Sequence, residues 1–180
     1  KHFLPRYLEL ISEFNFPTHS VELSFSRLVP FDKNEWTKIE FEILLNFQVE
    51  YFKHCLKTYP LPSFGDKIDS IIIMFWRSGI GVDKLLKVWE ETESVESNLH
   101  FKDLYFEGFE QYNRSKLSNS FGDKELCEKL TNWIQDPKVN TIFQERIERI
   151  ILDNSTFDQQ TIYEFNLLYD IIRNEKKNGT

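Results

Sequence analysis

The sequence predicts an all-α protein, and two observations support this fold class. Apolar residues recur at three- and four-residue spacing through most of the 180-residue chain, which is the period of an amphipathic helix. No segment shows the sustained apolar–polar alternation, bounded by tight turns, that is typical of strands. We expect about eight or nine helices in antiparallel pairs, arranged as an irregular bundle or a short HEAT-like α-solenoid.

The most apolar segment, 66–79 (DKIDSIIIMFWRSG), is expected to form the central helix. Its apolar residues would cover nearly the whole circumference of a helix, and a helix that is apolar all round is buried. Replacing Trp76 by alanine is therefore expected to be strongly destabilising. Gly79 follows the last turn, where glycine commonly ends a helix.

Start and stop signals place the other helices in chain order. Pro5 suits the first turn of a helix over 2–14, and a short helix is expected over 21–29. Asp32 and Glu35 have the spacing of a capping box. They predict a long helix that ends near residue 58 and carries apolar stripes on two opposite sides.

The second half of the chain is divided in the same way. A polar connection over 93–98 should separate two helices, and a loop should follow the second of them. Asp136-Pro137 is a strong start signal, with a capping residue followed by proline at the first helical position. The expected helices are 82–92, 99–112 and three more that begin near Asp123, Asp136 and the segment 156–159.

The composition and net charge of the chain limit the kinds of function that the protein is expected to have. Hydrophobic residues make up 41% of the chain, enough for one all-α domain over 1–180. The net charge of −7 argues against nucleic-acid binding, which needs a concentrated basic face. No apolar run is long enough to span a membrane and no signal peptide is visible, so we expect a cytoplasmic protein. The chain does not begin with Met, which predicts that the full-length protein has a further N-terminal segment.

The sequence carries no recognisable catalytic, cofactor or metal motif. Glu50 and His54 are four residues apart, as are Glu96 and His100, whereas di-iron bundles use Glu-x-x-His at a spacing of three. Cys55 follows His54, but adjacent residues on a helix point about 100° apart and cannot form a dyad. We expect no catalytic residue, no metal and no cofactor.

Two groups of charged residues are candidate contacts for a partner or ligand. Arginines among apolar residues need a carboxylate or carbonyl partner if they are half-buried, so they either brace the core or anchor a ligand. A glutamate cluster either is solvated or contacts a basic partner. The candidates are Arg6, Arg27 and Arg77 in the first group and Glu90, Glu91, Glu93 and Glu96 in the second.

Three segments, 2–11 (HFLPRYLELI), 17–28 (PTHSVELSFSRL) and 61–76 (LPSFGDKIDSIIIMFW), are similar to a family of bacterial proteins that has no established activity. The resemblance implies a bacterial, cytoplasmic protein. It implies no functional residues.

These observations favour a non-catalytic protein–protein interaction module. A bacterial immunity protein that neutralises a cognate toxin is one specific form, because an acidic surface suits a basic partner. The alternative is a small-ligand-binding protein or enzyme with an internal pocket lined by arginine and aromatic residues. A deep pocket that contains an arginine and a perturbed carboxylate would favour the alternative. A flat or concave acidic surface would favour the module.

Overall fold

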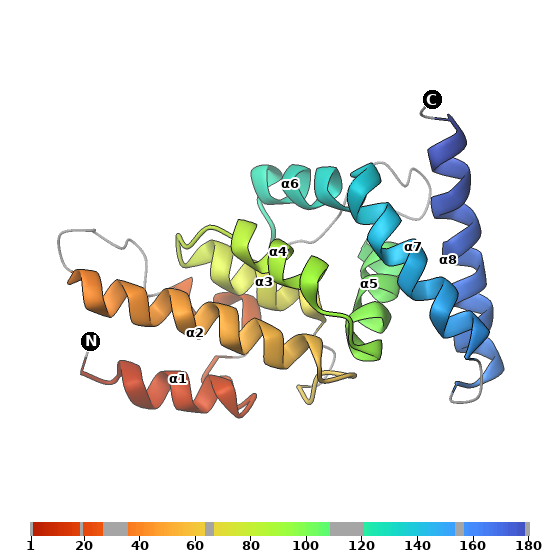
Figure 1. Ribbon diagram of the computed structural model, residues 1–180. Coiled ribbons are helices and arrows are strands. Elements are labelled where there is room, and N and C mark those ends of the chain that lie inside the picture. The colour runs from red at the N-terminus through yellow and green to blue at the C-terminus, as the bar shows by residue number, and fades with distance from the viewer. Residues whose placement is uncertain are drawn as a thin grey trace.

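The computed structural model describes residues 2–18, 20–26, 36–63, 67–108, 121–153 and 157–178. These ranges contain eight α-helices, one short 3-10 helix and no strand, which confirms the all-α fold class (Figure 1). The elements are α1 (Leu4–Ser12), the 3-10 helix η1 (Val21–Leu23), α2 (Lys38–Leu56), α3 (Ile68–Arg77), α4 (Asp83–Glu91), α5 (Val95–Gly108), α6 (Lys124–Ile134), α7 (Pro137–Leu152) and α8 (Gln159–Asn178).

Helix α3 is the buried helix that its composition predicts. Eight consecutive residues, from Ile68 to Phe75, are buried, and α3 packs against η1, α2 and α5. Trp76, however, is only half-buried, and its indole N–H donates to the Asp123 carboxylate at 2.7 Å. Trp76 therefore packs at the edge of the core and not at its centre, because the end of α3 reaches the surface, and the structure predicts a smaller cost for Trp76→Ala than the sequence alone does.

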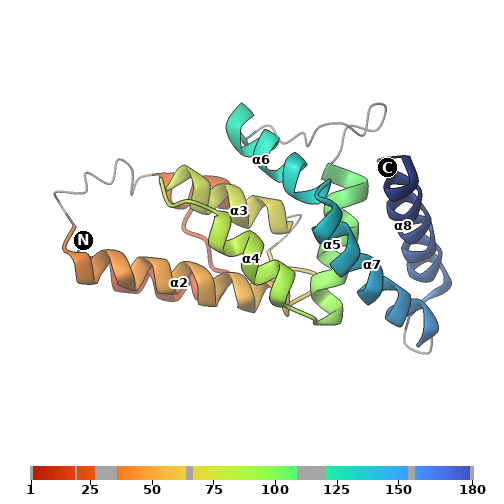
Figure 2. The same cartoon turned by 45° about the horizontal axis from the view of Figure 1, so that its top comes forward.

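A buried aromatic cluster lies where four later helices meet. Trp89 of α4, Phe101 of α5 and Phe143 of α7 are fully buried. Phe101 and Phe143 stack with their ring centroids 3.7 Å apart, and Trp133 of α6 lies 5.1 Å from Trp89. Figure 2 shows α4, α5 and α7 converging at this point, so the cluster joins the first half of the chain to the second.

Several helix boundaries differ from expectation. Helix α2 begins at Lys38, because Thr37 and Glu40 form a reciprocal capping box, and the proposed box at Asp32 and Glu35 lies outside the described residues. Helix α5 begins at Val95, so Glu96 lies in a first helical turn and not in a polar connection. The loop expected over 113–121 falls mostly outside the described residues.

The starts of the last three helices were predicted more accurately than the boundaries of α2 and α5. Asp123 and Asp136 cap α6 and α7 by accepting backbone N–H groups. At the start of α8 the carboxylate of Asp158 accepts the backbone N–H of Thr161 at 2.9 Å. The capping residue of α8 is therefore Asp158, and Gln159 is the first helical residue, so the capping box expected over 156–159 differs from the observed cap; Thr156 lies outside the described residues.

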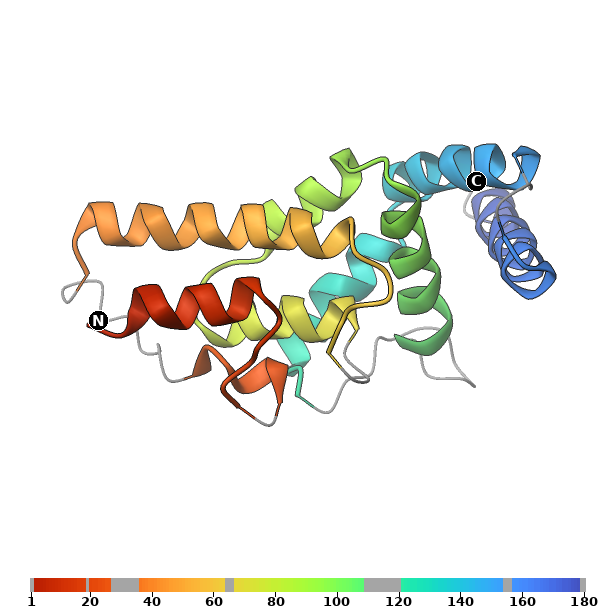
Figure 3. The ribbon, with the colours of Figure 1, turned by 90° about the horizontal axis from the view of Figure 1, so that it is seen from below.

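The two apolar stripes of α2 are only partly buried. Tyr51 and Phe52 in its second half are buried, whereas Ile39 and Ile43 in its first half are 70% and 54% exposed. Figure 3 shows α2 running beside α1 at one end of the molecule, while α7 and α8 cross at the other. Within the described ranges, no helix has the length and apolar content required to cross a lipid bilayer.

The aromatic cluster predicts that Trp89 contributes more to the stability of the fold than Trp76 does. Trp89→Ala should reduce the free energy of unfolding by about 3–5 kcal/mol, because it empties a fully buried site. Trp76→Ala should cost less than about 2 kcal/mol, because part of that ring is already solvated. Urea denaturation of both variants checks the order, and an equal or larger loss for Trp76→Ala would contradict this assignment of the core.

Candidate functional site

A buried arginine organises the region around the connector between α4 and α5 (92–94). Arg146 of α7 is 5% exposed. Its guanidinium donates to the carbonyl oxygens of Trp89 and Thr92 at 3.3 and 3.0 Å, and also to the carbonyl of Glu90. These carbonyls lie at the C-terminal end of α4, where backbone acceptors lack helical partners and a positive charge is favoured. Arg146 therefore fixes the end of α4 against α7.

The connector is also fixed from its other side. The Ser94 hydroxyl donates to the carbonyl of Leu56 at 3.0 Å and accepts the backbone N–H of Ser97 at 3.1 Å, so it caps α5. The indole N–H of Trp89 donates to the carbonyl of Ser97 at 3.1 Å. The connector thus has a defined position between α2, α4, α5 and α7.

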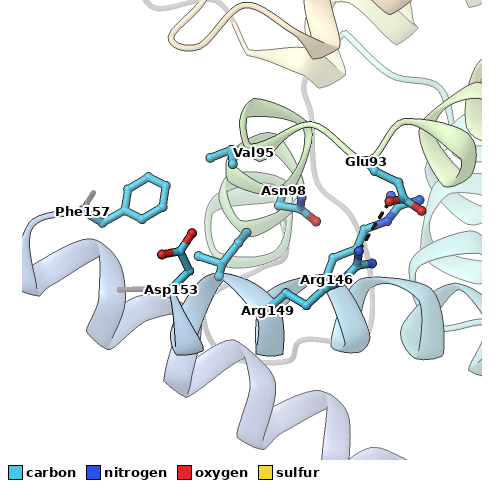
Figure 4. Close-up of a pocket in the computed structure, with 8 residues that line it drawn as sticks. Glu93, Val95, Asn98, Arg146, Arg149, Asp153 and Phe157 are labelled. Atoms are coloured by element: carbon cyan, nitrogen blue, oxygen red, sulfur yellow. Dashed lines mark hydrogen bonds and ion pairs between the residues drawn. The ribbon is translucent and has the colours of Figure 1, made fainter. Parts of the chain in front are cut away.

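A small cleft of about 200 Å³ lies beside this connector (Figure 4). We call it the Arg146 cleft. It is formed by the connector, the first turn of α5, one face and the C-terminal end of α7, and Phe157, two residues before the start of α8. Its lining residues are Glu93, Val95, Asn98, Arg146, Arg149, Ile150, Asp153 and Phe157.

The Arg146 cleft has an apolar end and a charged end. Phe157 and Val95 lie together at one end in Figure 4, while Glu93 and the two arginines lie at the other. Arg149 contacts Glu93 at 3.5 Å, with both side chains more than half exposed. Burial lowers the pKa of Arg146, while the nearby carboxylate of Glu93 opposes this and the positive charge of Arg149 adds to it.

Asn98 lies between the two ends. It is 2% exposed, and its amide N–H donates to the carbonyl of Ser94 at 2.7 Å. Its side-chain oxygen accepts no hydrogen bond within the described part of the chain. A buried acceptor without a donor costs free energy. A donor from outside the described residues would therefore stabilise this oxygen.

A second, more polar cleft lies on the other side of the same connector. It measures about 480 Å³ and is lined by Lys53, Lys57, Val88, Glu91, Thr92, Glu93 and Ser94. Because Glu93 lines both clefts, the connector forms a ridge between them.

The structure separates the two predicted groups of charged residues. Arg6 is exposed and pairs with Glu9 at 2.9 Å. Arg77 is exposed and donates to the carbonyl of Phe121 at 3.0 Å. Neither is the half-buried, core-bracing arginine that was expected, and Arg27 lies outside the described residues.

The four glutamates do lie together around the connector. Glu91 and Glu93 are exposed, whereas Glu90 and Glu96 are half-buried. The Glu90 carboxylate accepts the indole N–H of Trp133 at 3.1 Å, and Glu91 lies 3.7 Å from Lys87. Basic side chains from α2, α4 and α7 therefore accompany the acidic cluster.

Arg146 and Asn98 were not predicted from the sequence as residues of the site. The spacing contained a signal for the first, since Arg146 follows Phe143 by three residues and precedes Ile150 by four, which places it on the apolar face of α7. An arginine on such a face needs buried acceptors. No comparable signal marked Asn98.

A second polar cluster joins α5 to α8. Lys102 contacts Asp103 and Glu164 at 2.9 and 2.5 Å, and the Tyr59 hydroxyl donates to Asp103 at 2.8 Å. The hydrogen bond from Lys102 lowers the pKa of Glu164. His100 lies beside Tyr59 and contacts the carbonyls of Cys55 and Thr58. Since these groups satisfy one another, we interpret the cluster as a structural connection.

Comparison with known proteins assigns neither a family nor a function to the chain. Among the described residues, no group of three or more His, Cys, Asp or Glu side chains could hold a metal ion. No protein-family model, curated protein or solved structure matches the chain. The resemblance to bacterial proteins therefore stays a prediction, and the candidate site rests on its own geometry.

The Arg146 contacts predict a large effect on stability. Arg146→Met should reduce the free energy of unfolding by at least about 3 kcal/mol, because three carbonyl oxygens lose a charged donor. Arg149→Met is the matched control on the same helix and should cost less than about 1 kcal/mol, because Arg149 is exposed. Urea denaturation measures both, and similar losses would contradict the proposed role of Arg146.

His100 predicts how stability depends on pH. Burial lowers the pKa of His100 below its ordinary value of 6.5, so near and below that pH the unfolded chain binds a proton that the folded protein does not. Stability should therefore fall as the pH drops through this range. His100→Gln should reduce the fall in unfolding free energy between pH 7.5 and 5.5 relative to the unsubstituted chain. Equal pH profiles for the variant and the unsubstituted chain would contradict this origin.

Proposed function

We propose that this chain is a non-catalytic protein-binding module that recognises a segment of another protein through the face around the α4–α5 connector. The observation that carries the proposal is the Arg146 cleft. It contains two guanidinium groups, an amide oxygen that no described residue donates to, and apolar side chains that include the 40% exposed Val95. Recognition surfaces likewise combine apolar contacts with polar groups.

The dimensions of the two clefts favour a protein segment over a small molecule. Small-molecule sites usually enclose about 300–1,000 Å³ and are lined mainly by apolar side chains. The Arg146 cleft is smaller, at about 200 Å³. The second cleft is large enough, at about 480 Å³, but Val88 is its only apolar lining side chain. The ridge between them gives a larger surface than either cleft alone.

The charge of the chain supports a basic partner. The net charge is −7, and long-range attraction of this kind accelerates the association of oppositely charged proteins. A bacterial immunity protein that binds a basic toxin is the specific form that fits these properties. Glu91 and Glu93 are the expected acidic contacts, since both are exposed and line a cleft.

Site-specific photocrosslinking tests the proposal. A photoreactive amino acid at Val95 or Lys57 should capture a protein partner from the lysate of the source cells, because each position lines one cleft. The same amino acid at Asn132, which is exposed on α6, serves as the control and should capture much less. Mass spectrometry identifies the partner, and Glu91→Lys should reduce its capture by reversing an exposed charge of the second cleft.

Two results would overturn the proposal. One is the absence of any protein crosslinked through Val95 and Lys57. The other is capture of the same proteins with equal yield through Asn132, which would mean that the connector face has no preference.

A further inference from the structure

Asn98 lines the Arg146 cleft with its side chain in a fixed orientation. The amide N–H of Asn98 is held by the carbonyl of Ser94, and this bond fixes the side chain. The opposite atom, Oδ1, is buried and accepts no hydrogen bond from the residues that the structure describes. A ligand that donates an N–H here would remove an unfavourable feature of the free protein.

The charged end of the cleft holds two guanidinium groups close enough to repel each other. Arg146 uses both terminal nitrogens for carbonyl oxygens. Arg149 donates through Nε to the carbonyl of Glu145, and its Nη1 reaches Glu93 at 3.5 Å, the outer limit of a hydrogen bond. Its Nη2 donates to no acceptor among the described residues. A carboxylate is the group that best matches such an arginine.

The opposite end of the cleft is suited to an apolar side chain. It is formed by Val95, Ile150 and Phe157. Phe157 is held by an edge-to-face contact with the buried Phe165, at 6.0 Å between ring centroids.

We propose that the Arg146 cleft binds the C-terminal residue of a partner protein, with its carboxylate at Arg149, its backbone N–H at Asn98 Oδ1, and an apolar side chain against Val95, Ile150 and Phe157. This inference rests on the proposed function, since it specifies which part of the partner is recognised. An amino-acid residue at a C-terminus carries a carboxylate, an N–H and a side chain on one Cα atom. The cleft offers one complementary group for each, within a volume suited to a single residue.

Labelled peptides test this inference directly. The probes are fluorescein-labelled Gly-Ser-Gly-Ser-Gly-Phe and Gly-Ser-Gly-Ser-Gly-Leu, each with a free carboxylate or a C-terminal amide, and fluorescence anisotropy with the intact chain measures their affinity. Amidation should weaken binding by at least about tenfold, because it removes a charge-assisted hydrogen bond. Methylation of the last amide nitrogen should also weaken binding, because it removes the donor to Asn98. A peptide ending in Asp should bind more weakly than either.

Variants of two exposed arginines locate the contact. Arg149→Gln should abolish the difference between the acid and the amide, because the carboxylate loses its partner. Arg173→Gln removes the same charge from an exposed position on α8 that lies outside both clefts, and it should leave the difference unchanged. Both side chains are on the surface, so neither substitution should prevent folding.

Three outcomes would overturn the inference. They are equal binding of the acid and the amide, the same acid preference after Arg149→Gln, and no binding by any peptide of the set. A partner that crosslinks at Val95 through an internal segment would also overturn it while leaving the proposed function intact. Absence of any crosslinked partner would overturn the proposed function itself, whatever the peptides do.

Discussion

The arrangement of this helical protein depends on one buried cation. Arg146 brings its guanidinium into the interior, where an uncompensated charge would be strongly unfavourable. Three carbonyl oxygens at the end of α4 accept its hydrogen bonds. The ring of Phe143 also stabilises the charge, because its centroid lies 5.1 Å from the guanidinium carbon. Because α4 must end where Arg146 can reach it, this interaction sets both the length of α4 and its distance from α7.

The aromatic cluster and the Arg146 contacts act on the same helices and together define the Arg146 cleft. Stacking of Phe101 on Phe143 fixes α5 against α7, which places Asn98 opposite Arg149. The Lys102–Glu164 contact fixes α8 against α5, which brings Phe157 to the other end of the cleft. The lining residues therefore come from segments far apart in the chain, but each is positioned by neighbouring packing. A cleft that forms in this way requires little reorganisation on binding, which favours affinity.

The helices were largely predictable from sequence because helix periodicity and capping are local properties. The burial of α3 and the starts of α6 and α7 follow from residues that are neighbours in the chain. The local capping box of Thr37 and Glu40 was overlooked, and the box expected at Asp32 and Glu35 lies outside the described residues. The partial exposure of Trp76 could not be predicted, because it depends on how the end of α3 meets its neighbours. The candidate site was predictable only in part: Glu91 and Glu93 are at the clefts, whereas Arg6 and Arg77 are elsewhere. The Arg146 cleft could not be foreseen because its lining depends on how α5, α7 and the start of α8 meet.

The contacts of Arg146 have a consequence for how this surface can change during evolution. All three of its hydrogen-bond acceptors are main-chain atoms, which every residue type supplies. The hydrogen bonds of Arg146 therefore do not require particular side chains at Thr92 or Glu91, whereas the carboxylates of Glu90 and Glu93 add favourable charge near its guanidinium. The framework tolerates sequence drift at Thr92 and Glu91, which both border the second cleft. Related chains could acquire new partners by exchanging these side chains while the helices beneath stay in place.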